Sequence, residues 1–160
     1  MPNIVDAATA TTLDAFLGKD IRDICGTGFE DARVNHCAHF VGHALSINVG
    51  MVCGSMKYET RGEGASIRVD EIYNACPIRG AWGDLPKGTE RCLAFVTLPS
   101  NVAEGTMGSH PRKHVGVYID GSIWHYSNSG DKVVKHAPEA WLLLFKGVYG
   151  DATCMYHGIL

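Results

Sequence analysis

In the first half of the chain, apolar residues recur every three or four positions, which is the spacing of an amphipathic helix. Segments with this pattern occupy residues 10–20, 35–50 and 69–76. Asn35 is a good N-cap for the second segment, and Gly50 ends it. Pro77 stops the third. We therefore expect three short helices before the middle of the chain.

The second half has the patterns of β-strands. Residues 92–98 form a short apolar run, as in a buried strand, and residues 131–137 favour another short strand. Two β-rich runs flank Asp120-Gly121 within residues 113–127, which is typical of a hairpin with a type I′ turn. Residues 137–150 fit either a turn of helix followed by a strand or one apolar helix. Helices followed by a meander of strands predict an α+β fold with an antiparallel sheet.

The hairpin turn fixes the pairing of its strands. If Asp120 and Gly121 are the two loop residues, Ile119 pairs with Ser122. Gly116 then faces His125, and His114 faces Ser127. Because side chains alternate along a strand, His114 and His125 share one face as diagonal neighbours, about 7–8 Å apart at the backbone. A slip of one residue would separate them.

Composition narrows the functional class. The chain has 160 residues, 46% of them hydrophobic, with a formal net charge of -3. We therefore expect residues 1–160 to form a single globular domain, which is the catalytic domain. A weak negative charge without basic runs argues against nucleic acid or anionic membrane as the partner. No stretch approaches the roughly 18 apolar residues of a membrane span. The first residues lack the pattern of a secretory signal, which predicts synthesis in the cytoplasm.

The segment VNHCAHFVGHAL, residues 34–45, combines a cysteine with three histidines. Cys37 follows the Asn35 cap, at the end of the helix where unpaired N–H groups and the helix dipole favour an anion. This position predicts a lowered thiol pKa, and hence that Cys37 is the most reactive thiol. With His114 as base and His125 to orient it, the chain offers a Cys–His–His arrangement for nucleophilic catalysis. Asn128 is the alternative third member.

A metal site is the alternative explanation for the other histidines of this segment. His39 and His43 lie one helical turn apart and could bind zinc, but no HExxH pattern or CxxC pair accompanies them. We therefore expect no metal and no other cofactor. These side chains are interpreted as locally hydrogen-bonded polar groups, with His36 lining the cleft. The others, His110, His136 and His157, are interpreted as surface or structural residues.

Most of the six cysteines are interpreted as buried apolar side chains. A disulfide between Cys53 and Cys76 remains open.

Two blocks of the sequence resemble the NlpC-type cell-wall cysteine peptidases, which have a reduced papain-like fold. The block CAHFV, residues 37–41, resembles the family's cysteine block, and residues 114–130 resemble its histidine hairpin. The order Cys, His, His is also the family's. Departures lie next to the cysteine, where the family has Asp before and Ser-Gly after. The cysteine block is also similar to that of lecithin–retinol acyltransferase-like proteins, whose order is permuted.

The resemblance implies a papain-like NlpC-type fold and hydrolysis of amide bonds in peptidoglycan stem peptides, in which Cys37 attacks and its backbone N–H binds the oxyanion. It also implies an antibacterial effector with a cognate immunity protein, or a lysin, that reaches the periplasm or cell wall by specialised secretion or lysis. Alternatives are an acyltransferase or deamidase that uses the same thiolate, and a non-enzymatic metal-binding module. We expect the segment from Thr97 to Lys113 to be a loop bordering the cleft.

Overall fold

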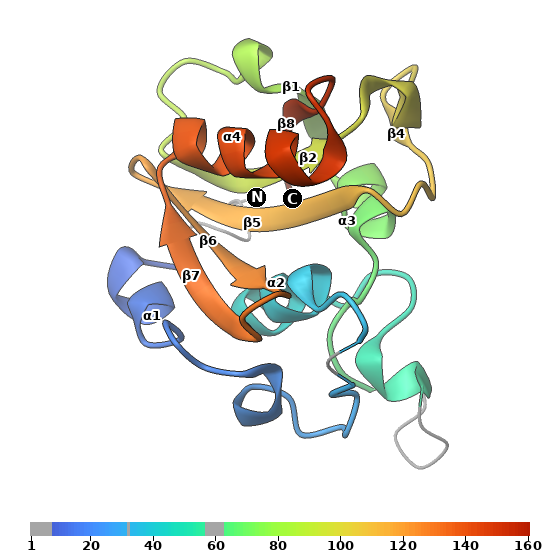
Figure 1. The fold of residues 1–160 in the computed structure, drawn as a ribbon, viewed down its shortest axis with the longest axis vertical. Helices are drawn as coiled ribbons and strands as arrows, with labels where there is room; N and C mark the ends of the chain where they lie inside the picture. The colour runs from blue at the N-terminus through green and yellow to red at the C-terminus, as the bar shows by residue number, and fades with distance from the viewer. Residues whose placement is uncertain (1–7, 32, 57–62) are drawn as a thin grey trace.

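The computed structural model describes residues 8–31, 33–56 and 63–160. These residues build a six-stranded antiparallel sheet in the order β1-β8-β2-β5-β6-β7, shown in Figure 1. Its strands are β1 (Ile78–Ala81), β2 (Arg91–Thr97), β5 (Lys113–Ile119), β6 (Ser122–Ser127), β7 (Lys132–His136) and β8 (Cys154–Ile159). The coarse prediction of an α+β fold with an antiparallel sheet is confirmed.

Helices cover both faces of this sheet. The α-helices are α1 (Ala10–Asp14), α2 (Cys37–Leu45), α3 (Val69–Ala75) and α4 (Pro138–Tyr149). Short 3-10 helices are η2 (Ile21–Asp23), η3 (Cys53–Met56), η5 (Trp82–Asp84) and η6 (Pro99–Asn101). Within the described residues, no helix has the length and apolar character that crossing a membrane requires.

Alternation along the strands separates two cores. Val115 and Val117 of β5 belong to the same buried cluster as Phe40 of α2. On the other face, Val96 of β2 belongs to a cluster with Trp141 of α4. In Figure 1, α4 accordingly lies on one side of β5 and α2 on the other. His114 is paired with Val96 in the ladder, so its side chain lies on the α4 face.

The hairpin follows the predicted register. Ile119 pairs with Ser122, and Val117 with Trp124. Asp120 and Gly121 have φ of 46° and 92°, the two positive values that a type I′ turn needs. The β5–β6 ladder stops at the Val117–Trp124 pair, so the expected pairing of Gly116 with His125 is not part of it. A Cβ on Gly116 would still lie 3.2 Å from that of His125, which shows how closely β6 passes this glycine.

Residues 137–150 form one helix, α4, which settles the alternative left open by their pattern. Two strands of the six-stranded sheet had no sequence prediction. β1 is short, and β8 at the end of the chain inserts between β1 and β2. The sheet therefore extends beyond the predicted meander on the side away from the hairpin.

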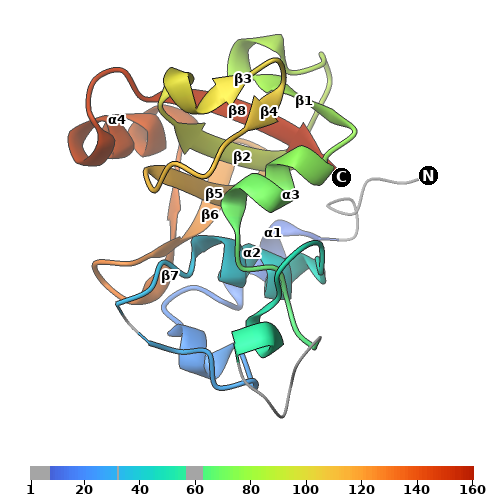
Figure 2. The same ribbon diagram turned by 90° about the vertical axis from the view of Figure 1, so that its right-hand side faces the viewer.

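The segment from Thr97 to Lys113, expected to be a loop, begins with the last residue of β2 and ends with the first of β5, and residues 98–112 lie outside the main sheet. Between the end of β2 and the start of β5 it contains η6 and a small two-stranded sheet, β3 (Val102–Ala103) with β4 (Thr106–Met107). Figure 2 shows this small sheet at the same end of the molecule as α3. The Asn74 side chain of α3 holds it by accepting from the Met107 N–H at 2.8 Å and donating to the Met107 carbonyl at 2.9 Å.

Candidate active site

Cys37 is the first residue of α2, as predicted, but Asn35 is not the N-cap. The cap residue is His36, whose side chain makes no capping hydrogen bond. Asn35 instead stabilises the helix start from one position earlier, because its Oδ1 accepts a hydrogen bond from the Cys37 N–H at 2.9 Å. The Cys37 N–H is therefore engaged, and the expectation that it serves as the free oxyanion donor is wrong for this arrangement.

The Cys37 thiol is buried, with 1% of the residue exposed. Burial raises its pKa to about 11, because the thiolate would lose its hydration. Hydrogen bonds from the backbone N–H groups of Val115 and Ala38, and the charge of Lys113, act in the opposite direction but do not prevail. The prediction of a lowered pKa at this helix start is therefore wrong, since desolvation outweighs the helix-end effect.

The two histidines of the hairpin lie together, as the register predicted. His114 Nε2 is 3.2 Å from His125 Nδ1, and the ring planes are nearly perpendicular, at 80°. Both rings are buried and pack under α4, where the His114 ring centroid lies 4.4 Å from that of Phe145. Burial lowers the pKa of His114 to about 3 and that of His125 well below its ordinary value. Both imidazoles are therefore neutral near pH 7.

A third imidazole extends the pair, and sequence reasoning missed it. His125 Nε2 lies 2.8 Å from His136 Nδ1, on β7. His136 pairs with Ile123, so His125 and His136 are diagonal neighbours on one face of the β6–β7 ladder. His136 is half-buried, so the chain of rings runs from the interior towards the surface. The sequence pattern does not indicate this contact, and from it His136 is interpreted only as a surface or structural residue.

The chain of rings prepares His114 to accept a proton. His114 Nδ1 is buried and has no hydrogen-bond partner among the described residues. If each ring donates from Nε2 to Nδ1 of the next, all three histidines are neutral and His114 Nδ1 keeps its lone pair. That lone pair is what a general base requires.

The structure places the Cys37 thiol against the backbone of β5 but does not join it to His114 by a hydrogen bond. The Cys37 sulfur contacts the backbone N–H of Val115, the next residue along β5. His114 Nδ1, the atom available to take the thiol proton, has no partner in the described part of the chain. The two groups therefore meet β5 at adjacent residues, with the His114 side chain on the α4 face of the sheet and α2 packed on the other face. A hydrogen bond between them would need one of the two side chains to move from this arrangement.

Asn128 acts on the helix start rather than on the base. Its Nδ2 donates to Asn35 Oδ1 at 2.9 Å, and its Oδ1 accepts from the His36 N–H at 3.0 Å. These hydrogen bonds run to the start of α2 and not to His114, so they do not favour Asn128 as the alternative third member. The Asn35 Oδ1 accepts from Asn128 and from the Cys37 N–H, and the Asn35 side chain also makes a hydrogen bond to the Cys37 thiol that acts to lower the thiol pKa.

Two pockets open beside these groups. The first, of about 380 Å³, is lined by Asn35, Cys37, Ile67, Arg68, Val69, Asp70, Ser109, Pro111 and Lys113. The second, of about 350 Å³, includes both hairpin histidines and apolar side chains of α4 such as Phe145 and Val148. Asn35 and Pro111 line both pockets. Because Ser109, Pro111 and Lys113 line the first pocket, the expectation that this segment borders the cleft is confirmed.

The other histidines of residues 34–45, and the other five cysteines, line neither of these two pockets. His36 is fully buried, so it does not line the cleft. It lies between His39, with Nδ1 atoms 3.0 Å apart, and the Asp31 carbonyl, 2.8 Å from its Nε2. All six cysteines are free, and Cys53 neighbours Cys25 rather than Cys76.

The likeness to the NlpC-type peptidases rests on the chain's own residues. No protein-family model, no curated protein and no solved structure matches this chain.

Proposed function

We propose that the protein is a cysteine hydrolase of amide bonds, with Cys37 as nucleophile, His114 as general base and acid, and His125 as the group that orients His114. The observation that carries this proposal is the unpartnered Nδ1 of His114. It lies at the inner end of the histidine chain, one residue from the strand position that contacts the Cys37 sulfur. Structural histidines in a core are usually hydrogen-bonded, so an orphaned ring nitrogen one residue from the strand contact of a thiol supports a catalytic role.

The proposed reaction starts from a neutral thiol and a neutral imidazole. As the Cys37 sulfur attacks the amide carbonyl, its proton passes to His114 Nδ1. A thioester forms when the C–N bond breaks, and the amine leaves with the proton from His114. Water then attacks the thioester with His114 as base, which releases the carboxylic acid and restores the thiol. Because the thiol pKa is raised, transfer of the proton accompanies attack instead of preceding it.

His125 and His136 stabilise the imidazolium that forms in this step. Protonated His114 donates from Nε2 to His125 Nδ1, and His125 donates to His136 in turn. These hydrogen bonds stabilise the positive charge on His114 and extend towards half-buried His136. Such stabilisation is needed because burial of the His114 ring opposes its protonation. For the oxyanion, the side-chain NH₂ of Asn35 replaces the engaged Cys37 N–H as the proposed donor.

The proposed substrate is a peptidoglycan stem peptide. Such peptides carry carboxylates next to their amide bonds and an amine on the diamino acid. The pocket that contains Cys37 presents charges of both signs, with Arg68 and Lys113 beside Asp70. Cations of this kind can bind the carboxylates and the carboxylate can bind the amine. This mixture of charges supports a short, zwitterionic peptide over a purely apolar acyl chain.

Digestion of purified peptidoglycan, with the products read by mass spectrometry, tests the proposal. Wild-type protein should release fragments that have gained one water at an amide bond. Cys37→Ala should release none while keeping its melting temperature. Cys92→Ala is the matched control, because Cys92 is equally buried but lies outside both pockets. Release of ammonia without chain cleavage would identify a deamidase instead, and cleavage by Cys37→Ala would refute the assigned nucleophile.

A further inference from the structure

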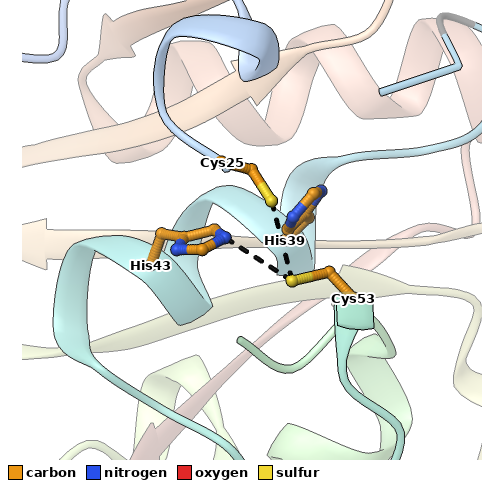
Figure 3. A group of neighbouring side chains, drawn as sticks. All are labelled: Cys25, His39, His43 and Cys53. Atoms are coloured by element: carbon orange, nitrogen blue, oxygen red, sulfur yellow. Dashed lines mark hydrogen bonds between the residues drawn. The ribbon is translucent and has the colours of Figure 1, made fainter. Parts of the chain in front are cut away.

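A second group of chemically reactive side chains surrounds α2, apart from Cys37 and the hairpin histidines. Cys25, His39, His43 and Cys53 each direct one ligand atom inward, and these four atoms all lie within 4.8 Å of one another. Figure 3 shows the two histidines on one face of α2, between the two cysteines. Cys25 follows η2, and Cys53 begins η3, so three separate segments meet at this point.

The distances suit one tetrahedral metal ion. Cys25 Sγ is 3.7 Å from Cys53 Sγ, and Cys53 Sγ is 3.7 Å from His43 Nε2. Zinc bonds of about 2.3 Å to sulfur and 2.0–2.1 Å to nitrogen, at tetrahedral angles, place two sulfurs about 3.8 Å apart and sulfur and nitrogen about 3.6 Å apart. The side chains thus have the spacing of a coordinated set before any ion is considered.

His39 supplies independent evidence for a ligand. Its Nε2 is buried and has no hydrogen-bond partner in the described residues. The other nitrogen, Nδ1, lies 3.0 Å from His36 Nδ1. His36 Nε2 in turn lies 2.8 Å from the Asp31 carbonyl, which can only accept a hydrogen bond.

These contacts set the tautomers of both neutral rings. His36 carries its proton on Nε2 to donate to Asp31, so its Nδ1 accepts. His39 must then carry its proton on Nδ1, which leaves a lone pair on Nε2. Metal-binding histidines are held in this way, with the second ring nitrogen hydrogen-bonded to a neighbour that fixes the tautomer. Without a metal or a hydrogen-bond donor, this buried lone pair on His39 Nε2 costs folding free energy.

The sulfur atoms are surrounded by donors. The Ala65 N–H donates to Cys53 Sγ at 3.3 Å, and the Thr27 N–H donates to Cys25 Sγ at 3.4 Å. Such hydrogen bonds stabilise the negative charge of a metal thiolate. Gly64 leaves room for the Cys53 sulfur, because a Cβ at residue 64 would lie 2.3 Å from Cys53 Sγ.

We propose that Cys25, His39, His43 and Cys53 bind one Zn²⁺ ion in a closed, structural site. Two thiolates and two imidazoles in tetrahedral array select zinc over the hard cations, which prefer oxygen. Four protein ligands leave no position for water or substrate, as in structural rather than catalytic zinc sites. The ion would join the segment after η2 to η3 through α2, and so hold the helix that carries Cys37. This inference is independent of the proposed hydrolase activity.

A disulfide between Cys25 and Cys53 is the competing explanation. It would require the two sulfurs, now 3.7 Å apart, to approach to about 2.05 Å. It would also leave His39 Nε2 buried and unpartnered. The zinc site accounts for the two histidines as well as the two cysteines.

Metal content of the whole chain decides the question. Protein expressed with added zinc and purified without chelators should contain about one zinc per chain by mass spectrometry of the metal. Replacement by Co²⁺ should give the thiolate charge-transfer band and the intense visible bands of a tetrahedral site. Removal of zinc with a strong chelator should lower the melting temperature, and added Zn²⁺ should restore it.

Variants locate the ligands. His39→Ala and Cys53→Ala should each retain less than about a tenth of the zinc, because loss of one ligand opens the site. Cys76→Ala and His157→Ala, which remove buried residues outside the cluster, should retain all of it. If the ligand variants fail to fold, the wild-type metal content and cobalt spectrum still decide. Wild-type protein without zinc and without a cobalt thiolate band, or with a Cys25–Cys53 disulfide, would overturn the proposal.

Discussion

The Nε2 atom of His125 lies 2.8 Å from Nδ1 of His136, so the histidine pair of the hairpin is the inner part of a chain of three rings. This contact links the buried His114–His125 pair to a half-buried residue on the neighbouring strand. It also gives His125 partners on both nitrogens, which fixes its ring orientation relative to His114. The role of each ring can be separated by substitution.

The inner contact predicts a large effect at His125. His125→Ala should reduce kcat/KM by on the order of 10²–10⁴, because His114 loses the group that holds its tautomer and orientation. His125→Asn and His125→Gln should retain more activity, since an amide can still accept from His114 Nε2. Steady-state kinetics with a synthetic stem peptide measures this. An active His125→Ala protein would leave only Cys37 and His114 as catalytic residues.

The outer contact predicts a smaller effect at His136. His136→Ala should reduce kcat by roughly tenfold, since it removes only the last hydrogen bond of the chain. His136→Asn should recover part of the loss. His110→Ala is the matched control. His110 is also half-buried, but its ring accepts from the Arg112 N–H and does not belong to the row of three hydrogen-bonded histidines. Equal losses in His136→Ala and His110→Ala would argue against a specific role.

The amide network at the start of α2 predicts coupled losses at Asn35 and Asn128. Asn35→Ala should reduce kcat by about 10²–10³, the range for loss of an oxyanion donor. Asn128→Ala should reduce kcat by about tenfold, because Asn35 is then no longer held at Oδ1.

A double-mutant cycle tests that coupling. If Asn128 acts through Asn35, the double variant should be no worse than Asn35→Ala alone. Asn48→Ala, an exposed asparagine away from both pockets beside Cys37, should change nothing. Fully additive losses would show that Asn128 has its own effect on the substrate.

Burial predicts an order of thiol reactivity that reverses the one expected from the helix start. Among the six cysteines, Cys154 is the one that is not buried. Iodoacetamide should therefore modify Cys154 first, and Cys37 slowly, because its pKa is raised to about 11 by burial. Peptide mapping after a short labelling reaction measures the order. Faster labelling of Cys37 than of Cys154 would mean that the site opens readily in solution.

The hairpin was predictable because local chemistry decides it. Asp120-Gly121 specifies the turn, the turn specifies the pairing, and alternation then places His114 and His125 together. His136 escaped the same reasoning because the connection between β6 and β7 spans residues 128–131, and a turn of that length does not fix a register from sequence. Its position becomes clear only when the second ladder is known.

Features that depend on distant packing could not be predicted. The pKa of Cys37 is set by burial against β5, which overrides the helix start. The Cys25–Cys53 contact brings together residues from separate loops without the CxxC spacing that marks a zinc knuckle. β8 pairs between β1 and β2, far from either in sequence, so alternation within it gives no indication of its neighbours.

Burial of His114 predicts that the protein loses stability as the pH falls below neutrality. The His114 pKa is lowered to about 3 in the folded state because its buried ring cannot be hydrated when charged. In the unfolded chain it titrates near its ordinary value of about 6.5. Between these values the unfolded state binds the proton and the folded state does not, so stability is fully present above about pH 6.5 and falls as the pH decreases towards 3.

The contribution of His114 alone should be about 2 kcal/mol between pH 7 and pH 5, taking 1.36 kcal/mol per pKa unit. Urea unfolding at both values measures it. His114→Gln should show a correspondingly smaller loss between the two pH values, since glutamine can still donate to His125 but does not titrate. Its free energy of unfolding at pH 7 need not equal that of the wild type, because only the difference between the two pH values is compared. An identical pH dependence in His114→Gln and wild type would show that His114 is protonated as easily when folded as when unfolded, and would contradict a buried neutral base.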